Sequence, residues 1–280
     1  MRTKKRMKKN FSLAVLSSVV IFAIASLIFV RDQNEVRISF DRAREVWRNE
    51  EYFKAAQLFL EVVRKYPHSD LADDALWEVA TTYYLNLYDI PTAIEYFERL
   101  TVEYPDSRMA PEAHKYLAEI FDKDLNEPFS AVHHWREALQ YNLPREQVGE
   151  IRLWMGDALF KQGEISEASE QYQLVRSQSD RQDQVCQALL RIGIVFQVKK
   201  QYEESIEIFR EVVADQACAD IVLQAKFLLI ESYEAVDQLN EAIAVAESID
   251  ESEVPAERRK EILDRLLEKR QYYNLELWNK

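Results

Sequence analysis

The sequence predicts an all-α protein, in which one N-terminal membrane-spanning helix precedes a solenoid of six helix-turn-helix units and a C-terminal capping helix. Three observations predict this fold. Residues 11–30 carry no charge, a small residue recurs every 37 or 38 positions further on, and the 280 residues include only four glycines and seven prolines. So few glycines and prolines disfavour a turn-rich β-sheet protein and suit long helices.

The N-terminus has the pattern of a membrane anchor. Six basic and no acidic residues occupy positions 1–10, and the charge-free residues 11–30 follow them. A helix of that length reaches roughly 30 Å, the thickness of the hydrocarbon core of a bilayer. Ala23-Ile24-Ala25 has the form of a cleavage site, so a cleaved signal peptide is the alternative. Because the apolar run continues through residues 27–30, we expect an uncleaved signal anchor.

The charge distribution predicts the topology. Basic residues that flank a span remain in the cytoplasm. We therefore expect a single-pass protein of the bacterial inner membrane, with residues 1–10 in the cytoplasm and the C-terminal domain in the periplasm. Since the six positive charges precede the span, the net charge of −13 leaves −19 for residues 31–280. Such an acidic domain disfavours nucleic acid as a partner.

One helix of each repeat is indicated by small residues at intervals of 38, 38, 37, 37 and 37. A large apolar residue lies four positions after five of the six, and a further apolar residue three positions after that. This spacing places all three on one face of an amphipathic helix. The small residues are Ala55, Ala93, Ala131, Ala168, Ser205 and Ala242.

A second amphipathic helix precedes the first in each repeat, and in five of the six repeats it has a small residue near its middle, whereas the sixth has Ile230 there. In two repeats the small residue is a glycine, Gly156 or Gly193. Glycine costs about 1 kcal/mol in a helix interior, so these positions indicate a close approach between the two helices. The solenoid is predicted at 31–250, with units at about 36–69, 70–107, 108–145, 146–182, 183–219 and 220–250.

Proline and serine residues mark two of the repeat boundaries, and the loss of the repeat spacing marks the end of the array. Pro67 and Pro105 each follow a tyrosine and precede a serine by two residues. Proline cannot extend a helix, and the serines, Ser69 and Ser107, are placed to cap the next one. Residues 251–280 have no repeat spacing but contain an apolar stripe at residues 262–267, which predicts a capping helix and tail.

This pattern resembles the tetratricopeptide repeat (TPR) family, and within it the bacterial envelope members with a single N-terminal membrane anchor. The resemblance covers about residues 35–250. The units here are longer than the family's usual repeat. The stretch 156–175 matches best, with Gly156, Phe160, Gly163, Ala168, Tyr172 and Val175 at family positions.

The resemblance implies a concave surface that binds peptides. The clamp of Lys and Asn that some members use for a terminal carboxylate is absent, because Phe40, Arg44, Trp77 and Thr81 occupy its positions. Aromatic residues at helical spacing also fit a buried core, and this alternative stays open. The residues carried over to the groove are Phe40, Arg44, Trp47, Trp77, Thr81, Tyr84, Leu153, Phe160, Leu190 and Phe227.

Two cysteines and four histidines are the remaining chemical candidates. Cys186 and Cys218 begin neighbouring hairpins, where they form either a disulfide or two free buried thiols. Parallel helices lie about 8–10 Å apart, which is wider than the usual Cα separation of a disulfide. His133 and Glu137 lie one turn apart near His114, but solvated histidines explain this pattern better than a metal ion. We predict no metal and no cofactor.

The sequence has no Gly-rich phosphate loop and no nucleophile with a neighbouring base. We therefore expect that the protein is not an enzyme and that it has no small-molecule substrate. The predicted function is that of a membrane-anchored scaffold in the cell envelope, which binds protein partners or extended peptides. The alternative is a holdase-like chaperone, an accessory factor for exported or envelope proteins.

Overall fold

The computed structural model describes residues 34–250 and 252–278, and within them the chain is built from helices and short loops, with no strand. The predicted cytoplasmic segment and membrane helix, residues 1–30, lie outside this part. None of the helices in the described part is both long and apolar enough to cross a membrane. The all-α prediction is confirmed for the described residues.

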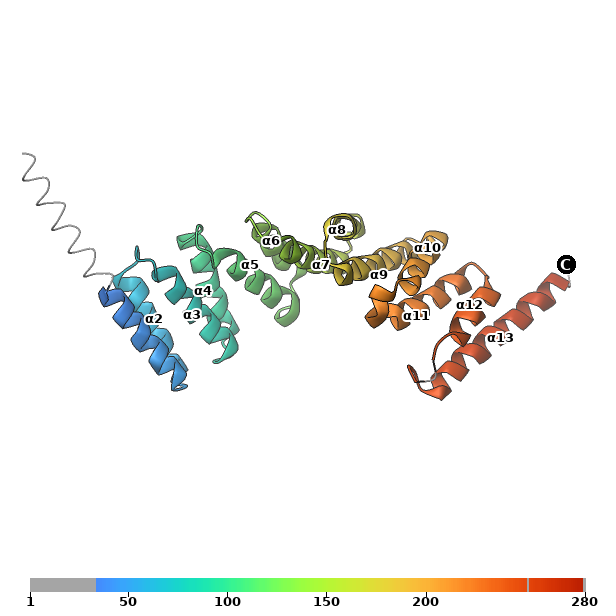
Figure 1. Cartoon of the computed structure of the whole chain (residues 1–280), viewed down its shortest axis with the longest axis horizontal. Helices are drawn as coiled ribbons and strands as arrows, with labels where there is room; N and C mark the ends of the chain where they lie inside the picture. The colour runs from blue at the N-terminus through green and yellow to red at the C-terminus, as the bar shows by residue number, and fades with distance from the viewer. Residues whose placement is uncertain (1–33, 251, 279–280) are drawn as a thin grey trace, which may run out of the picture. The chain divides into compact units, whose positions relative to one another are not determined.

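The chain divides into two compact units, residues 1–117 and residues 118–280. Figure 1 colours their helices in chain order. In the N-terminal unit α2 packs on α3, and α3 packs on α4. Its helices are residues 34–48, α2 (Tyr52–Lys65), α3 (Ala72–Leu85), α4 (Ile90–Glu103) and most of α5 (Ala110–Glu119).

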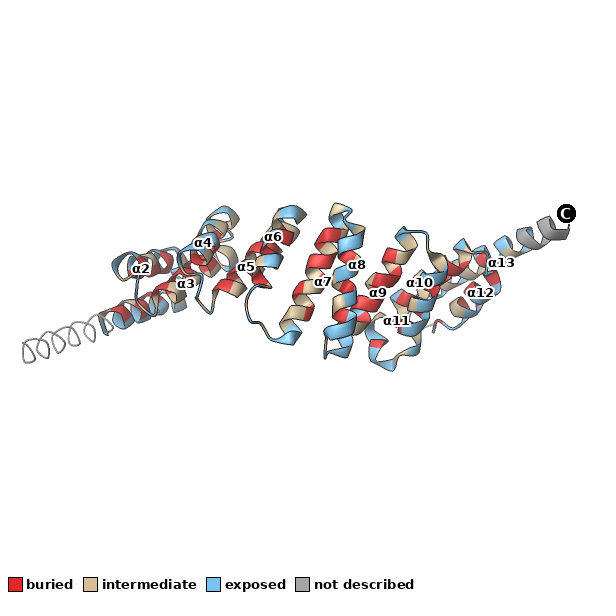
Figure 2. Ribbon diagram, turned by 90° about the horizontal axis from the view of Figure 1, so that it is seen from above, coloured by how far each residue is buried: buried red, intermediate tan, exposed pale blue. Residues whose placement is uncertain are grey.

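The C-terminal unit repeats the same arrangement, because each helix packs on the next from α6 to α13. Figure 2 shows that its helices carry buried residues on one side and exposed residues on the other. The elements are the π-helix η1 (Ile120–Asp124), α6 (Pro128–Ala138), α7 (Arg145–Gln162), α8 (Ile165–Gln178), α9 (Gln182–Val198), α10 (Tyr202–Ala214), the 3-10 helix η2 (Gln216–Cys218), α11 (Ala219–Ala235), α12 (Leu239–Glu247) and α13 (Ala256–Trp278).

The two helices of a hairpin approach each other at the predicted glycines. A Cβ atom at Gly193 in α9 would lie 2.3 Å from the ring of Phe209 in α10. The equivalent atom at Gly156 in α7 would lie 2.4 Å from the ring of Tyr172 in α8. The predicted close approach is therefore confirmed in both hairpins: the aromatic ring occupies the space that a larger side chain would need.

The two Tyr-Pro boundaries differ in their serines. Ser107 accepts a hydrogen bond from the backbone N–H of Met109 (3.0 Å) and donates one to Asp73 (2.6 Å), so it holds the turn directly before α5 and does not cap the helix itself. The Oγ of Ser69 is buried without a hydrogen-bond partner, and α3 has no side-chain cap. The predicted capping role of Ser69 is wrong.

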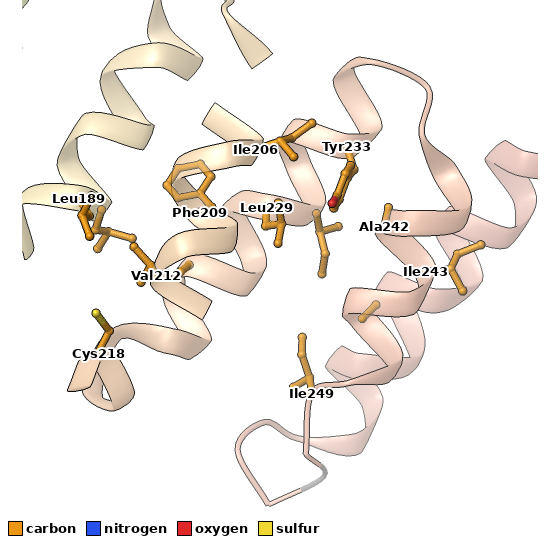
Figure 3. Close-up of a cluster of buried hydrophobic side chains, with 14 of the residues drawn as sticks. Leu189, Ile206, Phe209, Val212, Cys218, Leu229, Tyr233, Ala242, Ile243 and Ile249 are labelled. Carbon is orange, nitrogen blue, oxygen red and sulfur yellow. The ribbon is translucent and has the colours of Figure 1, made fainter. Parts of the chain in front are cut away.

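Apolar side chains from α9 to α13 form the core at the C-terminal end (Figure 3). Phe209 and Leu229 lie at its centre, and Leu266 brings α13 into it as a fully buried residue. Arg265 adds an ion pair from α13 to Glu234 of α11, at 2.8 Å. The last helix therefore covers the apolar face that α11 and α12 would otherwise expose.

Cys186 and Cys218 form a disulfide, with their Cα atoms 5.4 Å apart. Cys186 lies in α9, whereas Cys218 lies in the short helix η2 that precedes α11. Because η2 packs against α9, the bond does not have to bridge the full distance between two parallel helices. It ties the start of α11 to the hairpin before it.

Candidate functional site

A pocket of about 490 Å³ in the C-terminal unit is the candidate site. Residues from η1, α6 and α7 line it, so two successive hairpins build it together. Aromatic and charged side chains alternate around it. The lining residues are Asp122, Lys123, Trp135, Trp154, Asp157, Phe160 and Lys161.

The aromatic part of the pocket contains an unused hydrogen-bond donor. The rings of Trp135 and Trp154 lie 5.3 Å apart, and the Nζ of Lys123 is 5.8 Å from the ring of Trp154. Trp135 is 2% exposed, and its Nε1 is buried with no hydrogen-bond partner. An indole N–H can only donate, and leaving it unpaired is unfavourable. A ligand that brought an acceptor within reach of this nitrogen would satisfy it.

Hydrogen bonds hold the charged side chains of the pocket in place. Lys161 pairs with Asp122 at 2.7 Å, across the two hairpins. Asp157 accepts two bonds from Arg191 of α9, at 2.6 and 2.8 Å, and one from the hydroxyl of Tyr172 of α8, at 2.9 Å. Bidentate pairs of this kind fix geometry as well as charge. Burial, followed by the charge of Asp157, raises the pKa of Tyr172, so this hydroxyl stays a neutral donor.

Two acidic and two basic side chains line the pocket, so their formal charges cancel. Both carboxylates are already engaged by protein donors. A ligand with a net charge therefore gains little here, whereas an apolar side chain gains contact with Trp154 and Phe160, which are partly buried. The arrangement suits a neutral, largely apolar group with one hydrogen-bond acceptor.

The structure corrects three of the predicted groove residues. Leu153, Leu190 and Phe40 are buried at 3%, 5% and 7% exposure, respectively. The two leucines belong to the hydrophobic clusters of the C-terminal unit, and the ring of Phe40 lies 5.1 Å from that of Phe59. These side chains pack within the hairpin stack, so a partner cannot reach them.

Phe160 and Phe227 are the other predicted groove residues of the C-terminal unit. Phe160 lines the aromatic pocket. Phe227 is half-buried, and the guanidinium of Arg258 in α13 lies 5.1 Å from the centre of its ring. The capping helix thus occupies one side of Phe227.

The predicted residues of the N-terminal unit are held by contacts within the protein. The indole of Trp47 donates to the hydroxyl of Thr82 (3.1 Å), and the hydroxyl of Thr81 donates to the backbone oxygen of Trp77 (2.9 Å). Trp77 and Tyr84 both pack edge-on against Tyr116, with ring centres 5.4 and 5.8 Å away. These aromatic side chains are half-buried, so part of each remains accessible, while Arg44 is exposed.

Phe160 is the lining residue that belongs to the predicted groove set; Lys123, Trp135, Trp154 and Lys161 are among those that were not predicted to bind a partner. Trp135 is the large apolar residue four positions after Ala131, and this position in the repeat predicted only a core residue. Trp154 and Lys161 each follow a predicted inner-face residue directly in the chain. The charge-aromatic alternation of 154–161 is a signal that could have identified them.

Helical hairpins packed in succession make this chain an α-solenoid repeat protein. The family model described as "Tetratricopeptide repeat" matches residues 74–107 and 187–216. These ranges contain α4 and α10, the helices that carry the repeated small and large residues. The match identifies tetratricopeptide repeats in these two ranges, whereas the predicted anchor lies outside the described residues.

Solved structures share the fold at low sequence identity. RapI in its apo form has a TM-score of 0.59 at 13% identity, over 86% of this chain and 73% of that one. PilF from Pseudomonas aeruginosa has a TM-score of 0.51 at 12% identity, over 85% and 99%. YrrB, a TPR protein with an unusual peptide-binding site, has 0.51 at 19% identity, over 67% and 90%. No curated protein matches the sequence.

The match to a repeat family agrees with the prediction that the chain is not an enzyme. Repeat hairpins bury their apolar faces against one another and offer the remaining surface to partners. In the described part of the chain, the hairpins form a solenoid of this kind.

Proposed function

We propose that the scaffold captures an extended segment of a partner protein at the aromatic pocket of the C-terminal unit. The unpaired Nε1 of Trp135 carries this proposal, because it is a buried donor on a side chain that lines the pocket. An apolar side chain of the partner contacts Trp154 and Phe160. A carbonyl or hydroxyl oxygen of the same segment accepts the hydrogen bond from Trp135.

The properties of the pocket suit a peptide better than a folded surface. Its volume of about 490 Å³ accommodates one or two side chains. Large aromatic residues provide much contact area at a low entropic cost, and they are frequent among the residues that dominate binding. That YrrB, a protein of the same fold, has a peptide-binding site supports this use of the fold.

The same proposal includes a location. The scaffold is held in the bacterial inner membrane by residues 11–30, with its repeats in the periplasm, and it recruits partners within the cell envelope. The basic residues 1–10 and the charge-free stretch after them support this placement. The Cys186–Cys218 bond is also in keeping with an oxidising compartment. Fractionation of cells that produce the full chain should place it with the inner membrane, and a soluble chain would contradict this.

Site-specific crosslinking tests the proposed binding. A photo-reactive amino acid replaces Phe160 in the full chain, in native membranes, and mass spectrometry identifies what is captured. Tyr272 in α13, which is 72% exposed and outside the pocket, is the control position. We expect one or two partner proteins to be captured at position 160 and none of them at position 272. Adding Trp154→Ala should abolish the capture at position 160.

Two other outcomes would change the conclusion. Equal capture at both positions would contradict binding in the pocket. Capture of many unrelated exported proteins at position 160 would instead favour the holdase-like alternative, which predicts weak and promiscuous binding.

A further inference from the structure

A second pocket lies in the C-terminal unit, where the first two turns of α7 face the end of α8. It has a volume of about 310 Å³ and shares no lining residue with the aromatic pocket. Two arginines of α7 line it, seven positions apart and so on one face of the helix. The lining residues are Arg145, Val148, Gly149, Arg152, Leu174, Val175, Ser177, Gln178, Ser179 and Asp180.

Arg152 is a cation without a carboxylate partner. Its Nη1 donates to the side-chain oxygen of Gln171 at 2.7 Å, but its Nε is buried and has no hydrogen-bond partner. Among the described residues, none forms an ion pair with it. Burial lowers the pKa of its guanidinium, and the charge of Glu170 opposes this shift only in part. A partly buried guanidinium with free donors is unfavourable unless an acceptor is present.

Neighbouring arginines of the same unit show how such a group is normally satisfied. Arg191 pairs with Asp157, Arg176 with Glu211, and Arg181 with Glu146 and Asp183. Arg152 differs because its protein contact is a neutral amide. A carboxylate partner, which each of these three arginines has, is absent at Arg152.

Arg145 supplies a second, more mobile cation to the same pocket. Its side chain is 76% exposed and lies 3.4 Å from Asp180, which is exposed to a similar extent. Such surface pairs contribute little to stability, so Arg145 can turn towards a ligand. Asp180 and Glu170 are the acids near the two arginines, and both are exposed and able to move away.

We propose that this pocket binds an oxyanion, a carboxylate or phosphate group, between Arg145 and Arg152. A guanidinium offers several N–H donors in a plane, which match two oxygens of such a group. The guanidinium of Arg152 donates to the ligand, which supplies the charged partner that the protein does not provide. Ser177 and Ser179 also line the pocket, but their hydroxyl groups already donate within the protein, to backbone oxygens of α8 and to the side chain of Gln184. This site is independent of the proposed peptide binding.

The side-chain Nε–H resonance of Arg152 reports on this site directly. We would titrate the full chain in detergent micelles with inorganic phosphate and with acetate, at constant ionic strength maintained with chloride. Arg152→Lys identifies the resonance. We expect a saturable shift with one or both anions and none with chloride; phosphate alone defines a tetrahedral ligand, and acetate alone a carboxylate.

Variants at exposed positions test the geometry without disturbing the core. Arg145→Gln should weaken binding about tenfold, since it removes one charged partner. Arg210→Gln, which removes an exposed charge from α10 of the same unit, should leave the affinity unchanged. Glu170→Gln should strengthen binding, because it removes a competing acid. Shifts that do not saturate, or that are equal in wild type and Arg145→Gln, would overturn the proposal.

Trp154→Ala separates the two sites. It should leave the anion titration unchanged, even if it abolishes capture of a partner at the aromatic pocket. A parallel loss of both activities would show that the pocket at Arg152 has no function of its own and would overturn the proposal of an independent site.

Discussion

Replacing Gly193 by alanine tests the contact on which each hairpin depends. The added Cβ would lie 2.3 to 2.7 Å from three atoms of the Phe209 ring, where ordinary contacts begin near 3.4 Å. Overpacking of a core costs about 1–3 kcal/mol. Alanine recovers about 1 kcal/mol of helix propensity relative to glycine. Since Phe209 is fully buried and cannot move freely, the cost of overpacking should lie in the upper part of this range, about 2–3 kcal/mol. After the gain in helix propensity is subtracted, we expect Gly193→Ala to lower the free energy of unfolding by about 1–2 kcal/mol.

Chemical unfolding of the full chain, followed by circular dichroism, measures this difference. Phe209→Leu provides the second side of a double-mutant cycle, because a smaller side chain makes room for the new methyl group. We expect the double variant to be more stable than the sum of the two single changes predicts. A neutral or stabilising effect of Gly193→Ala, or strict additivity with Phe209→Leu, would refute the close approach.

Three further predictions concern the disulfide, the partly buried Glu78 and Trp154 in the aromatic pocket. Replacing Cys186 and Cys218 by serine should lower the free energy of unfolding by about 3–4 kcal/mol, because the bond closes a loop of more than thirty residues in the unfolded chain; unfolding curves with and without reductant should show the same loss in wild type and no effect in the variant. Burial raises the pKa of Glu78, although the charge of Arg44 opposes it, so the stability tied to its neutral form is present at acid pH and is lost as the pH rises through the raised pKa. Glu78→Gln should therefore stabilise the protein at neutral pH and lose this advantage in acid; a less stable variant at pH 7 would contradict the assignment. Trp154→Ala should weaken partner binding by about 2 kcal/mol, roughly thirtyfold, in a binding assay in which Tyr272→Ala is unchanged.

The repeat itself was predictable because its spacing reflects a physical contact. Gly193 and Phe209 lie sixteen positions apart in the sequence and touch in the structure, and the same holds for Gly156 and Tyr172. A small residue is required wherever a large ring is placed on the facing helix. Such pairs are visible in one sequence, since they recur at a constant interval.

The groove was predicted less well, because apolar residues on the inner helix serve two purposes. Leu153 and Leu190 occupy positions where some family members contact peptides, but here they complete the core. Trp135 has the opposite outcome: its ring is in the core, and its Nε1 is left without a partner beside a pocket. Sequence spacing predicts which helix face a residue occupies, but not which of its atoms is left unpaired.

Ser69 and Ser107 differ because the acidic residues 34 positions before them form different hydrogen bonds. Ser107 donates to Asp73, which lies 34 positions before it. The residue 34 positions before Ser69 is Glu35, and its longer side chain accepts a hydrogen bond from the hydroxyl of Tyr66 instead. One extra methylene group thus changes the hydrogen bonding of two boundaries that look alike in the sequence. The π-helix η1 is similarly hidden, since an additional residue within a helical turn leaves no pattern of its own.

The indole N–H resonance of Trp135 reports directly on whether the aromatic pocket receives a segment of a partner protein. The segment captured at position 160 would be added to the full chain as a peptide, and the resonance followed through the titration. We predict a saturable downfield shift, as expected when an unpaired donor gains an acceptor, and its loss in Trp154→Ala. A resonance that does not change while the peptide binds would show that the peptide binds elsewhere and would contradict binding at the aromatic pocket.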